Sequence, residues 1–200
     1  MFLGLIIGWN KIGEETMLKK NALVILLLFL VSGCTTCKGV KTGESGDEPP
    51  MILDSYAAES VRPGATWRVF LKAQDADGDM HSIITQLVQP GIGYYPPDFT
   101  YIKEADREGF AGYLILRTPR DYNLLQEYVE ATLTLQDCEG NKSEPVKFTL
   151  RFDNKSGFGP QEVPEKWQTA ANRKLGTIMV EIRSVVEDNK EGNSSRPLSP

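Results

Sequence analysis

The fold of this chain is decided by residues 133 to 150, which read LTLQDCEGNKSEPVKFTL. Apolar and polar residues alternate up to Gln136 and again from Val146, and a polar stretch with Gly140 and Pro145 separates the two runs. Alternation with a period of two is typical of a β-strand with one buried face. The stretch therefore predicts two consecutive strands joined by a turn.

Outward from this hairpin, runs of strand length continue through the middle of the chain. They occupy residues 52–57, 67–73, 80–88, 99–102, 110–116, 129–136 and 146–152. Short strands separated by turns at this spacing are typical of a sandwich of two sheets. We therefore expect a mainly β protein, with a single antiparallel β-sandwich of about seven strands over residues 51–152.

Two stretches resemble the immunoglobulin-like (Ig-like), cadherin-like and PKD-type domains of bacteria. LKAQDADGDM (71–80) is similar to their second-to-third strand junction, and LTLQDCEGNKSEPVKFTL (133–150) is similar to their final hairpin. The resemblance implies an Ig-like sandwich, but it implies no activity, because one fold of this kind supports many functions. The chain lacks the inter-sheet cysteine pair of antibody domains, so the looser bacterial Ig-like group fits better.

The Ig-like topology would bring the loop after the second strand close to the turn of the final hairpin. Six oxygen-bearing side chains would then lie near one another: Asp75, Asp77, Asp79, Asp137, Glu139 and Asn141. Carboxylate and amide oxygens are ligands that calcium prefers, so this end is a candidate calcium site. The alternative is structural, because Asp, Asn and Gly also dominate turns for backbone reasons.

An aromatic segment, QPGIGYYPPDFTY (89–101), follows the third strand. Its candidate contact residues for a sugar or a protein partner are Tyr94, Tyr95, Phe99 and Tyr101. Tyr covers contact area at a low cost in conformational entropy. The alternative is that these rings simply cover an edge of the sandwich.

The N-terminal region predicts export and a lipid anchor. Residues 17–33 have a basic start and about ten apolar residues, which is typical of a helical signal peptide and too short to span a bilayer. The four residues VSGC (31–34), at the end of the apolar run, resemble the lipobox of bacterial lipoproteins. The resemblance implies cleavage before Cys34, acylation of Cys34 (a palmitate-type anchor), and an outer-membrane location, because Thr rather than Asp stands at 35.

The remaining segments are expected to be accessory. Residues 1–16 fit poorly ahead of the signal peptide, and we interpret them as an upstream extension, with translation starting at Met17. Residues 34–50 predict a lipidated flexible tether, 153–163 a linker, and 189–200 a disordered tail.

The chain has three cysteines, and the two that are not expected to be acylated are Cys37 and Cys138. In the Ig-like topology the first strand starts at the end where Cys138 lies, and the compartment would be oxidising. We therefore expect a disulfide between Cys37 and Cys138, with two free or intermolecular thiols as the alternative.

A stripe of apolar residues at spacings of three and four follows the linker. It includes Trp167, Ile178 and Ile182, and it predicts an amphipathic helix over residues 164–188. Gly176 weakens this helix, and a strand over residues 176–182 is the alternative, but the stripe continues through both flanks and favours the helix. Such a helix would pack on its own domain, self-associate or dock in the groove of an envelope protein.

Several function classes are disfavoured. The chain carries a net charge of −5 and lacks the basic footprint of a nucleic-acid binder. Its single histidine, His81, excludes a multi-histidine zinc site, and no nucleophile-elbow or phosphate-loop sequence appears. We expect a membrane-anchored, non-catalytic binding or assembly module. The alternative is a calcium- or glycan-binding domain for small ligands, and the third reading is a carbohydrate-active enzyme.

Overall fold

The computed structural model of the protein describes residues 48–155 and 162–186. The strands of these residues are β1 (Met51–Ala57), β2 (Ser60–Val61), β3 (Thr66–Gln74), β4 (Met80–Gln89), β5 (Gly93–Tyr94), β6 (Asp98–Tyr101), β7 (Gly109–Arg117), β8 (Tyr128–Asp137), β9 (Val146–Phe152) and β10 (Lys174–Ile178). Four short 3-10 helices join them: η1 (Glu104–Asp106), η2 (Tyr122–Leu124), η3 (Glu165–Trp167) and η4 (Ala170–Asn172).

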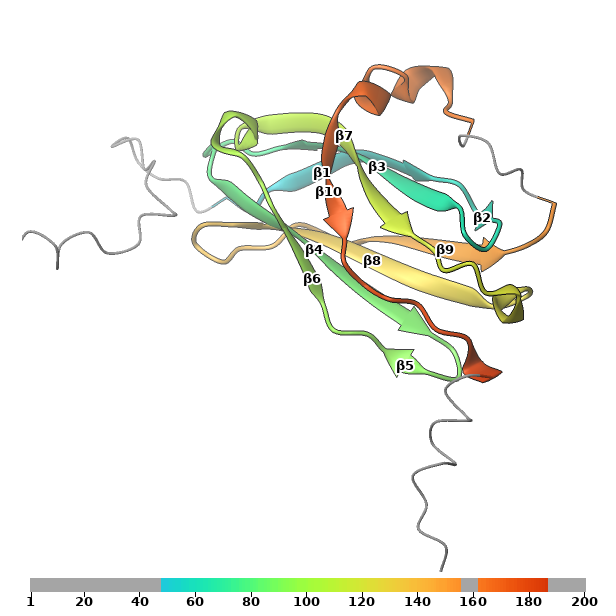
Figure 1. The fold of residues 1–200 in the computed structure, drawn as a ribbon. Helices are drawn as coiled ribbons and strands as arrows, with labels where there is room; N and C mark the ends of the chain where they lie inside the picture. Colours follow the sequence, from blue (N-terminus) through green and yellow to red (C-terminus); the bar gives the residue numbers. More distant parts are fainter. Residues whose placement is uncertain (1–47, 156–161, 187–200) are drawn as a thin grey trace, which may run out of the picture. The chain divides into compact units, whose positions relative to one another are not determined.

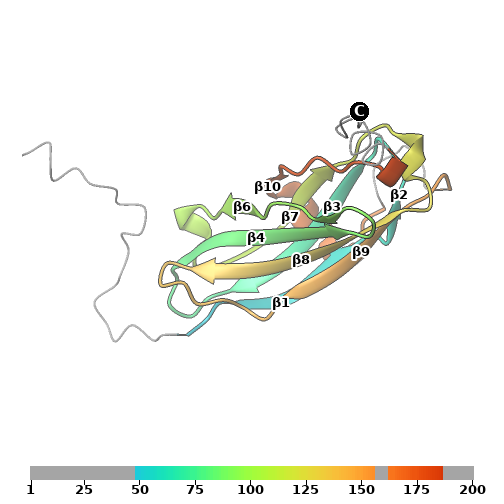
Figure 2. The same ribbon diagram turned by 90° about the horizontal axis from the view of Figure 1, so that it is seen from below.

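The strands form two layers, as Figure 1 and, from below, Figure 2 show. One sheet has the order β1-β3-β7-β10, and the other has the order β2-β9-β8-β4-β5, with β6 also paired to β4. All seven segments predicted as strands are strands in the structure. The mainly β sandwich predicted from period-two alternation is therefore confirmed.

The core lies between the two sheets and follows the alternation. In β3 it takes Trp67, Val69 and Leu71, and in β8 it takes Leu133 and Leu135, all at most 1% exposed. Each fully buried side chain of this size contributes on the order of 1.5–3 kcal/mol relative to an exposed one. Burial of one face of each strand also fixes the pairing register, because a slip by one residue would turn the apolar face toward solvent.

The strand order is that of an Ig-like sandwich. Pairs β3·β7 and β4·β8 form the centres of the two sheets, and the β3–β4 loop lies at the same end as the β8–β9 turn, since Met80 pairs with Asp137. The expectation of a purely antiparallel sandwich is wrong at two edges. There β2 runs parallel to β9, and β10 runs parallel to β7.

The predicted amphipathic helix over residues 164–188 is wrong. In the described part of this segment, η3 and η4 are single 3-10 turns, and the chain then becomes β10 and continues through residues 179–184 without helix or strand. Ile178, Ile182 and Ser184 are buried, and the side chains between them are more exposed, so the segment alternates between buried and exposed residues without a helical period.

The competing pattern was present in the same residues. KLGTIMVEI (174–182) is rich in β-branched residues, whose stiff side chains favour strands, and it contains Gly176, which weakens a helix. β7 would otherwise be an edge with unpaired backbone groups, and β10 satisfies them. The helical spacing of Trp167, Leu175 and Ile178 is therefore a coincidence of two different environments.

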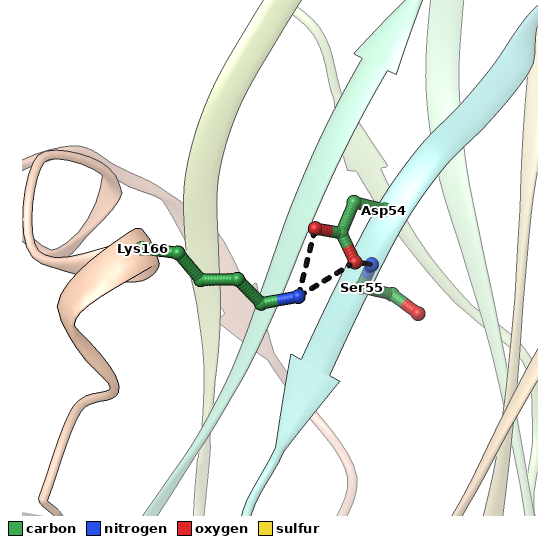
Figure 3. Close-up of polar contacts among 3 residues, drawn as sticks. All are labelled: Asp54, Ser55 and Lys166. Atoms are coloured by element: carbon green, nitrogen blue, oxygen red, sulfur yellow. Dashed lines mark hydrogen bonds and ion pairs between the residues drawn. The ribbon is translucent and has the colours of Figure 1, made fainter.

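Before β10, the segment covers the outer face of the four-stranded sheet. Trp167 packs on Phe70 with ring centroids 5.7 Å apart, in a small cluster that includes Ala170. Lys166 extends from η3 to β1, and its Nζ donates to both carboxylate oxygens of Asp54 at 3.0 and 3.3 Å (Figure 3). These contacts attach the segment to both the face and the edge of the sheet.

Several sequence predictions lie outside the described residues. They concern the extension and signal peptide (1–33), Cys34, Cys37 and the C-terminal tail (189–200). Among the residues that are described, no helix is both long and apolar enough to cross a membrane.

Candidate functional site

The exposed face of the six-stranded sheet carries a row of three aromatic side chains. Phe99 and Tyr101 lie on β6, opposite Ile84 and Ser82 of β4, and Tyr94 of β5 lies opposite Val88. Cross-strand partners point to the same face of a sheet. Because the three β4 partners are separated by even numbers of residues, Tyr94, Phe99 and Tyr101 share one face. We call them the aromatic row.

The row points away from the core. Ile83 and Leu87, which alternate with the partners of the row along β4, are buried between the sheets. Tyr94, Phe99 and Tyr101 are 80%, 49% and 69% exposed. Large aromatic side chains seldom remain this exposed in a group, and such groups often mark contact surfaces.

Tyr95, the fourth predicted contact residue, does not belong to the row. It is 7% exposed, its hydroxyl donates to Gln89 Oε1 at 2.6 Å, and it accepts the Arg183 backbone N–H at 3.1 Å. The reason is the alternation itself, because neighbouring residues of an extended chain point to opposite faces. Tyr95 is therefore a structural residue that ties the C-terminal segment to β4.

The backbone under the row is firmly held. Gln86 of β4 donates through its side-chain amide to the carbonyl of Tyr95 at 2.6 Å, and the Tyr95 N–H donates to the Leu87 carbonyl at 3.0 Å. On the next strand, Asp98 Oδ1 accepts the N–H of Met179, whose own side chain is 80% exposed beside β6. The rings of the row therefore project from a backbone with fixed geometry.

The acidic residues of the two loops also lie together at one end of the sandwich. The Cys138 N–H donates to the carbonyl of Asp79 at 3.2 Å, and Asp79 donates its backbone N–H to Asp75 Oδ2 at 2.9 Å. Asp137 Oδ1 accepts three backbone N–H groups, those of Glu139, Gly140 and Asn141, at 2.7–2.9 Å. Asp137 therefore builds its turn, as the structural alternative requires.

The proximity of these carboxylates changes the acidity of one of them. Burial, followed by a side-chain hydrogen bond to Asp75 and the negative charges of Asp137, Asp75 and Asp77, raises the pKa of Asp79 from 3.8 to about 6. Asp75 is 4% exposed, and its Oδ1 has no hydrogen-bond partner among the described residues.

A metal site is not evident in this geometry. Within residues 48–155 and 162–186, no group of three or more His, Cys, Asp or Glu side chains is arranged to hold a metal ion. Calcium at Asp75, Asp77, Asp79, Asp137, Glu139 and Asn141 stays a prediction from the sequence. The disulfide also stays a prediction, because Cys138 is half-buried in the β8–β9 turn and Cys37 is not described.

Trp167, Ile178 and Ile182 are not available to a partner, contrary to the prediction. They are 3%, 2% and 1% exposed, respectively. Trp167 is packed on Phe70, and the other two side chains join the main core. The predicted helix is wrong, and these three residues pack on their own domain, which is one of the outcomes expected for the segment, whereas Met179 is 80% exposed.

A cavity next to the row was not predicted from the sequence. It has a volume of about 200 Å³, lies between β6 and β10, and is lined by Tyr101 of the row together with Lys103, Arg173 and Lys174. About 70 residues separate its two walls in the chain, and local patterns carry no signal for such a meeting. Recognition of 174–178 as a strand would have been the only route to it.

Comparison with known proteins assigns the chain to no family. No protein-family model matches the chain, and no curated protein matches it. Among solved structures it is similar to the PKD domain of an M14-like peptidase from Thermoplasmatales archaeon SCGC AB-540-F20, at 14% identity and a TM-score of 0.35, over 54% of this chain and 98% of that chain.

A second similar structure is the CARDB domain of the PF1109 protein from Pyrococcus furiosus, solved in complex with di-metal ions. The identity is 10% and the TM-score 0.29, over 52% of this chain and 93% of that chain. The assignment of an Ig-like sandwich rests on the strand order and register described above, and not on these two likenesses.

Proposed function

We propose that the protein is a non-catalytic binding module of the bacterial envelope, held to the membrane by lipid on Cys34, and that it binds a glycan along the aromatic row. The observation that carries the proposal is the exposure of Tyr94, Phe99 and Tyr101 in line on one face of a sheet. The lipobox resemblance supports the envelope location.

The shape of the row favours an elongated ligand. Phe99 and Tyr101 are two residues apart on one strand, which places their attachment points about 7 Å apart. Tyr94 is aligned with Val88, four residues beyond the partner of Phe99 on β4, or about 13 Å farther along the sheet. A chain of sugar rings presents apolar C–H faces at intervals, and flat aromatic rings pack well against such faces.

The alternative of assembly through a docking helix has lost its support. That proposal depended on an unpartnered apolar helical face in residues 164–188, but in the described part no such helix forms, and Trp167, Ile178 and Ile182 are buried, whereas Met179 and Val186 are exposed. The aromatic row keeps three large aromatic side chains accessible on one face of a sheet. Binding by stacked rings also requires no acid, base or nucleophile, which fits a non-catalytic role.

The experiment is a glycan-binding measurement on the full chain in detergent, with envelope polysaccharides and peptidoglycan fragments as ligands. We expect binding to at least one glycan, and at least a tenfold loss of affinity in a Tyr94→Ala/Tyr101→Ala variant, because each stacked ring contributes about 1 kcal/mol. Tyr122→Ala is the matched control, since Tyr122 is 55% exposed but lies on η2, outside the row. Binding that survives in the double variant would refute the proposal.

A further inference from the structure

The cavity beside the aromatic row differs in charge from the rest of the chain. Its lining contains three cationic side chains, Lys103, Arg173 and Lys174, and one carboxylate, Asp106, whereas the chain as a whole has a net charge of −5. Concave sites lined by one sign of charge concentrate the field and attract ions of the opposite sign. This local reversal of charge suggests a role in binding an anionic group.

The two lysines are the groups free to meet such an anion. Arg173 is engaged by Asp106, which is 8% exposed and close to it, so this pair is neutral as a unit. Within the described residues, neither Lys103 nor Lys174 forms an ion pair, and both are exposed at the mouth of the cavity. An incoming anion would therefore meet two unneutralised ammonium groups.

The walls of the cavity are built by a close approach of two strands. A Cβ placed on Gly176 of β10 would lie 2.5 Å from Thr100 Cγ2 of β6, so only glycine permits this distance. The register of β10 against β7 shifts between Lys174 and Gly176, and such irregularities redirect side chains. The apolar part of the lining is formed by Ile83, Ile102 and Leu175.

Tyr101 joins the cavity to the aromatic row. It lines the cavity, it is 69% exposed, and its ring stands edge-on to His81 with centroids 5.3 Å apart, which restrains its orientation. A ligand bound at this end would stack on Tyr101 and direct a substituent toward Lys103 and Lys174. The cavity volume of about 200 Å³ fits one sugar-sized group.

We infer that the cavity between β6 and β10 is an anion subsite that binds the carboxylate of an acidic sugar stacked on Tyr101, with Lys103 and Lys174 as its cationic ligands. This inference rests on the proposed function, since it names the class of glycan that the aromatic row accepts. Phosphate could satisfy the lysines in the same way, but it offers no ring face to Tyr101.

The test uses the full chain in detergent and four small probes: D-galacturonate, D-galactose, acetate and inorganic phosphate. We expect galacturonate to bind about fivefold or more tightly than either galactose or acetate, because only galacturonate has both the ring and the charge. Raising the salt concentration should weaken its binding, since the lysines lie at the surface. Inorganic phosphate is the fourth probe and reports on the charge alone.

Two variants assign the effect to the cavity. Lys103→Gln/Lys174→Gln should reduce galacturonate binding about fivefold or more and leave galactose binding unchanged. Lys142→Gln/Lys155→Gln, which removes the same charge from exposed positions elsewhere, should change neither. Tyr101→Ala should weaken the binding of galacturonate and leave the binding of phosphate unaffected.

The outcomes separate this inference from the proposed function. Equal binding of galacturonate and galactose, or no effect of the lysine changes, would overturn the anion subsite while binding along the row stands. If phosphate or acetate binds as tightly as galacturonate, the assignment of an acidic sugar as the ligand is overturned. In a third case, galacturonate binding depends on the two lysines, but polysaccharide binding is unchanged by the replacement of Tyr94. This result would support the anion subsite and contradict glycan binding along the aromatic row.

Discussion

At the scale of single residues, the position of a side chain in the alternation decides whether it contacts a ligand or the core. Tyr94 and Tyr95 are neighbours of the same type, yet one is 80% exposed and the other 7% exposed. Gln89, which is fully buried, accepts the Tyr95 hydroxyl and donates to the Arg183 carbonyl at 2.8 Å. The two adjacent tyrosines therefore have separate roles: Tyr94 is available to a ligand, and Tyr95 belongs to the packed structure.

Replacement of Tyr95 by Phe tests the structural role. The change leaves Gln89 Oε1 and the Arg183 N–H without the hydroxyl partner that each has in the structure. We expect the free energy of unfolding, measured by urea denaturation, to fall by about 1–3 kcal/mol. Tyr101→Phe is the control and should change the stability very little, and an equal effect of both changes would contradict the assignment.

The raised pKa of Asp79 leads us to expect an unusual dependence of stability on pH. Its pKa is about 6 in the folded protein and about 3.9 in an unfolded chain, so the folded state binds the proton more tightly. The resulting stabilisation is complete below pH 4 and is lost as the pH rises through 6. Above pH 6, ionised Asp79 adds repulsion among Asp75, Asp77 and Asp137.

Asp79→Asn removes this titration. We expect the variant to be more stable than the wild type by up to about 1 kcal/mol at pH 7.5, after allowance for solvent screening, and nearly equal to it at pH 4. Thermal unfolding at the two pH values measures the difference. A variant that loses stability at pH 7.5 would show that the Asp79 carboxylate has a favourable partner there, such as a bound cation.

At the scale of secondary structure, the sequence allowed prediction of seven strands but not of β10 or of the two-residue strands β2 and β5. Each of the seven has its own alternation and turn signals, which are local. β10 shares its apolar residues with a helical spacing, and the choice between strand and helix depends on the vacant edge of β7, about 60 residues away. Tyr94, Phe99 and Tyr101 were candidate contact residues because of the aromatic composition of residues 89–101, which does not distinguish them from Tyr95, whereas the cavity needed the position of β10.

Gly176 tests the attachment of β10. Gly176→Ala would place a methyl group within 2.5 Å of Thr100 Cγ2, so we expect a loss of about 1–3 kcal/mol in unfolding free energy. Thr100→Ala removes the clashing atoms and should restore part of the loss in the double variant. Additive effects of the two changes in denaturation measurements would mean that the strands do not approach as described.

At the scale of the whole molecule, the proposal combines a lipid anchor at one end of the chain with a binding face on the sandwich. In the sequence, a polar stretch separates the proposed signal peptide and Cys34 from the sandwich, which begins at Met51. A tethered module of this kind would reach ligands near the membrane without itself entering the bilayer.

Cys34→Ser tests the anchor. We expect the wild-type protein to incorporate labelled palmitate and to fractionate with the outer membrane, because dual acylation gives stable membrane binding. The variant should incorporate no label and lose its stable membrane attachment. Cys138→Ser serves as the control and should stay acylated. Labelling of the Cys34→Ser protein would contradict the lipobox assignment.

The most direct test of the central claim is an NMR titration of the full chain in detergent with the glycan that binds most tightly. We expect chemical-shift changes confined to the aromatic row, its β4 partners, including Ile84 and Val88, and the adjoining cavity with Lys103 and Lys174, with saturation at one site. Changes confined to the four-stranded sheet or to the loop at 75–79, or no change with any glycan, would contradict the claim.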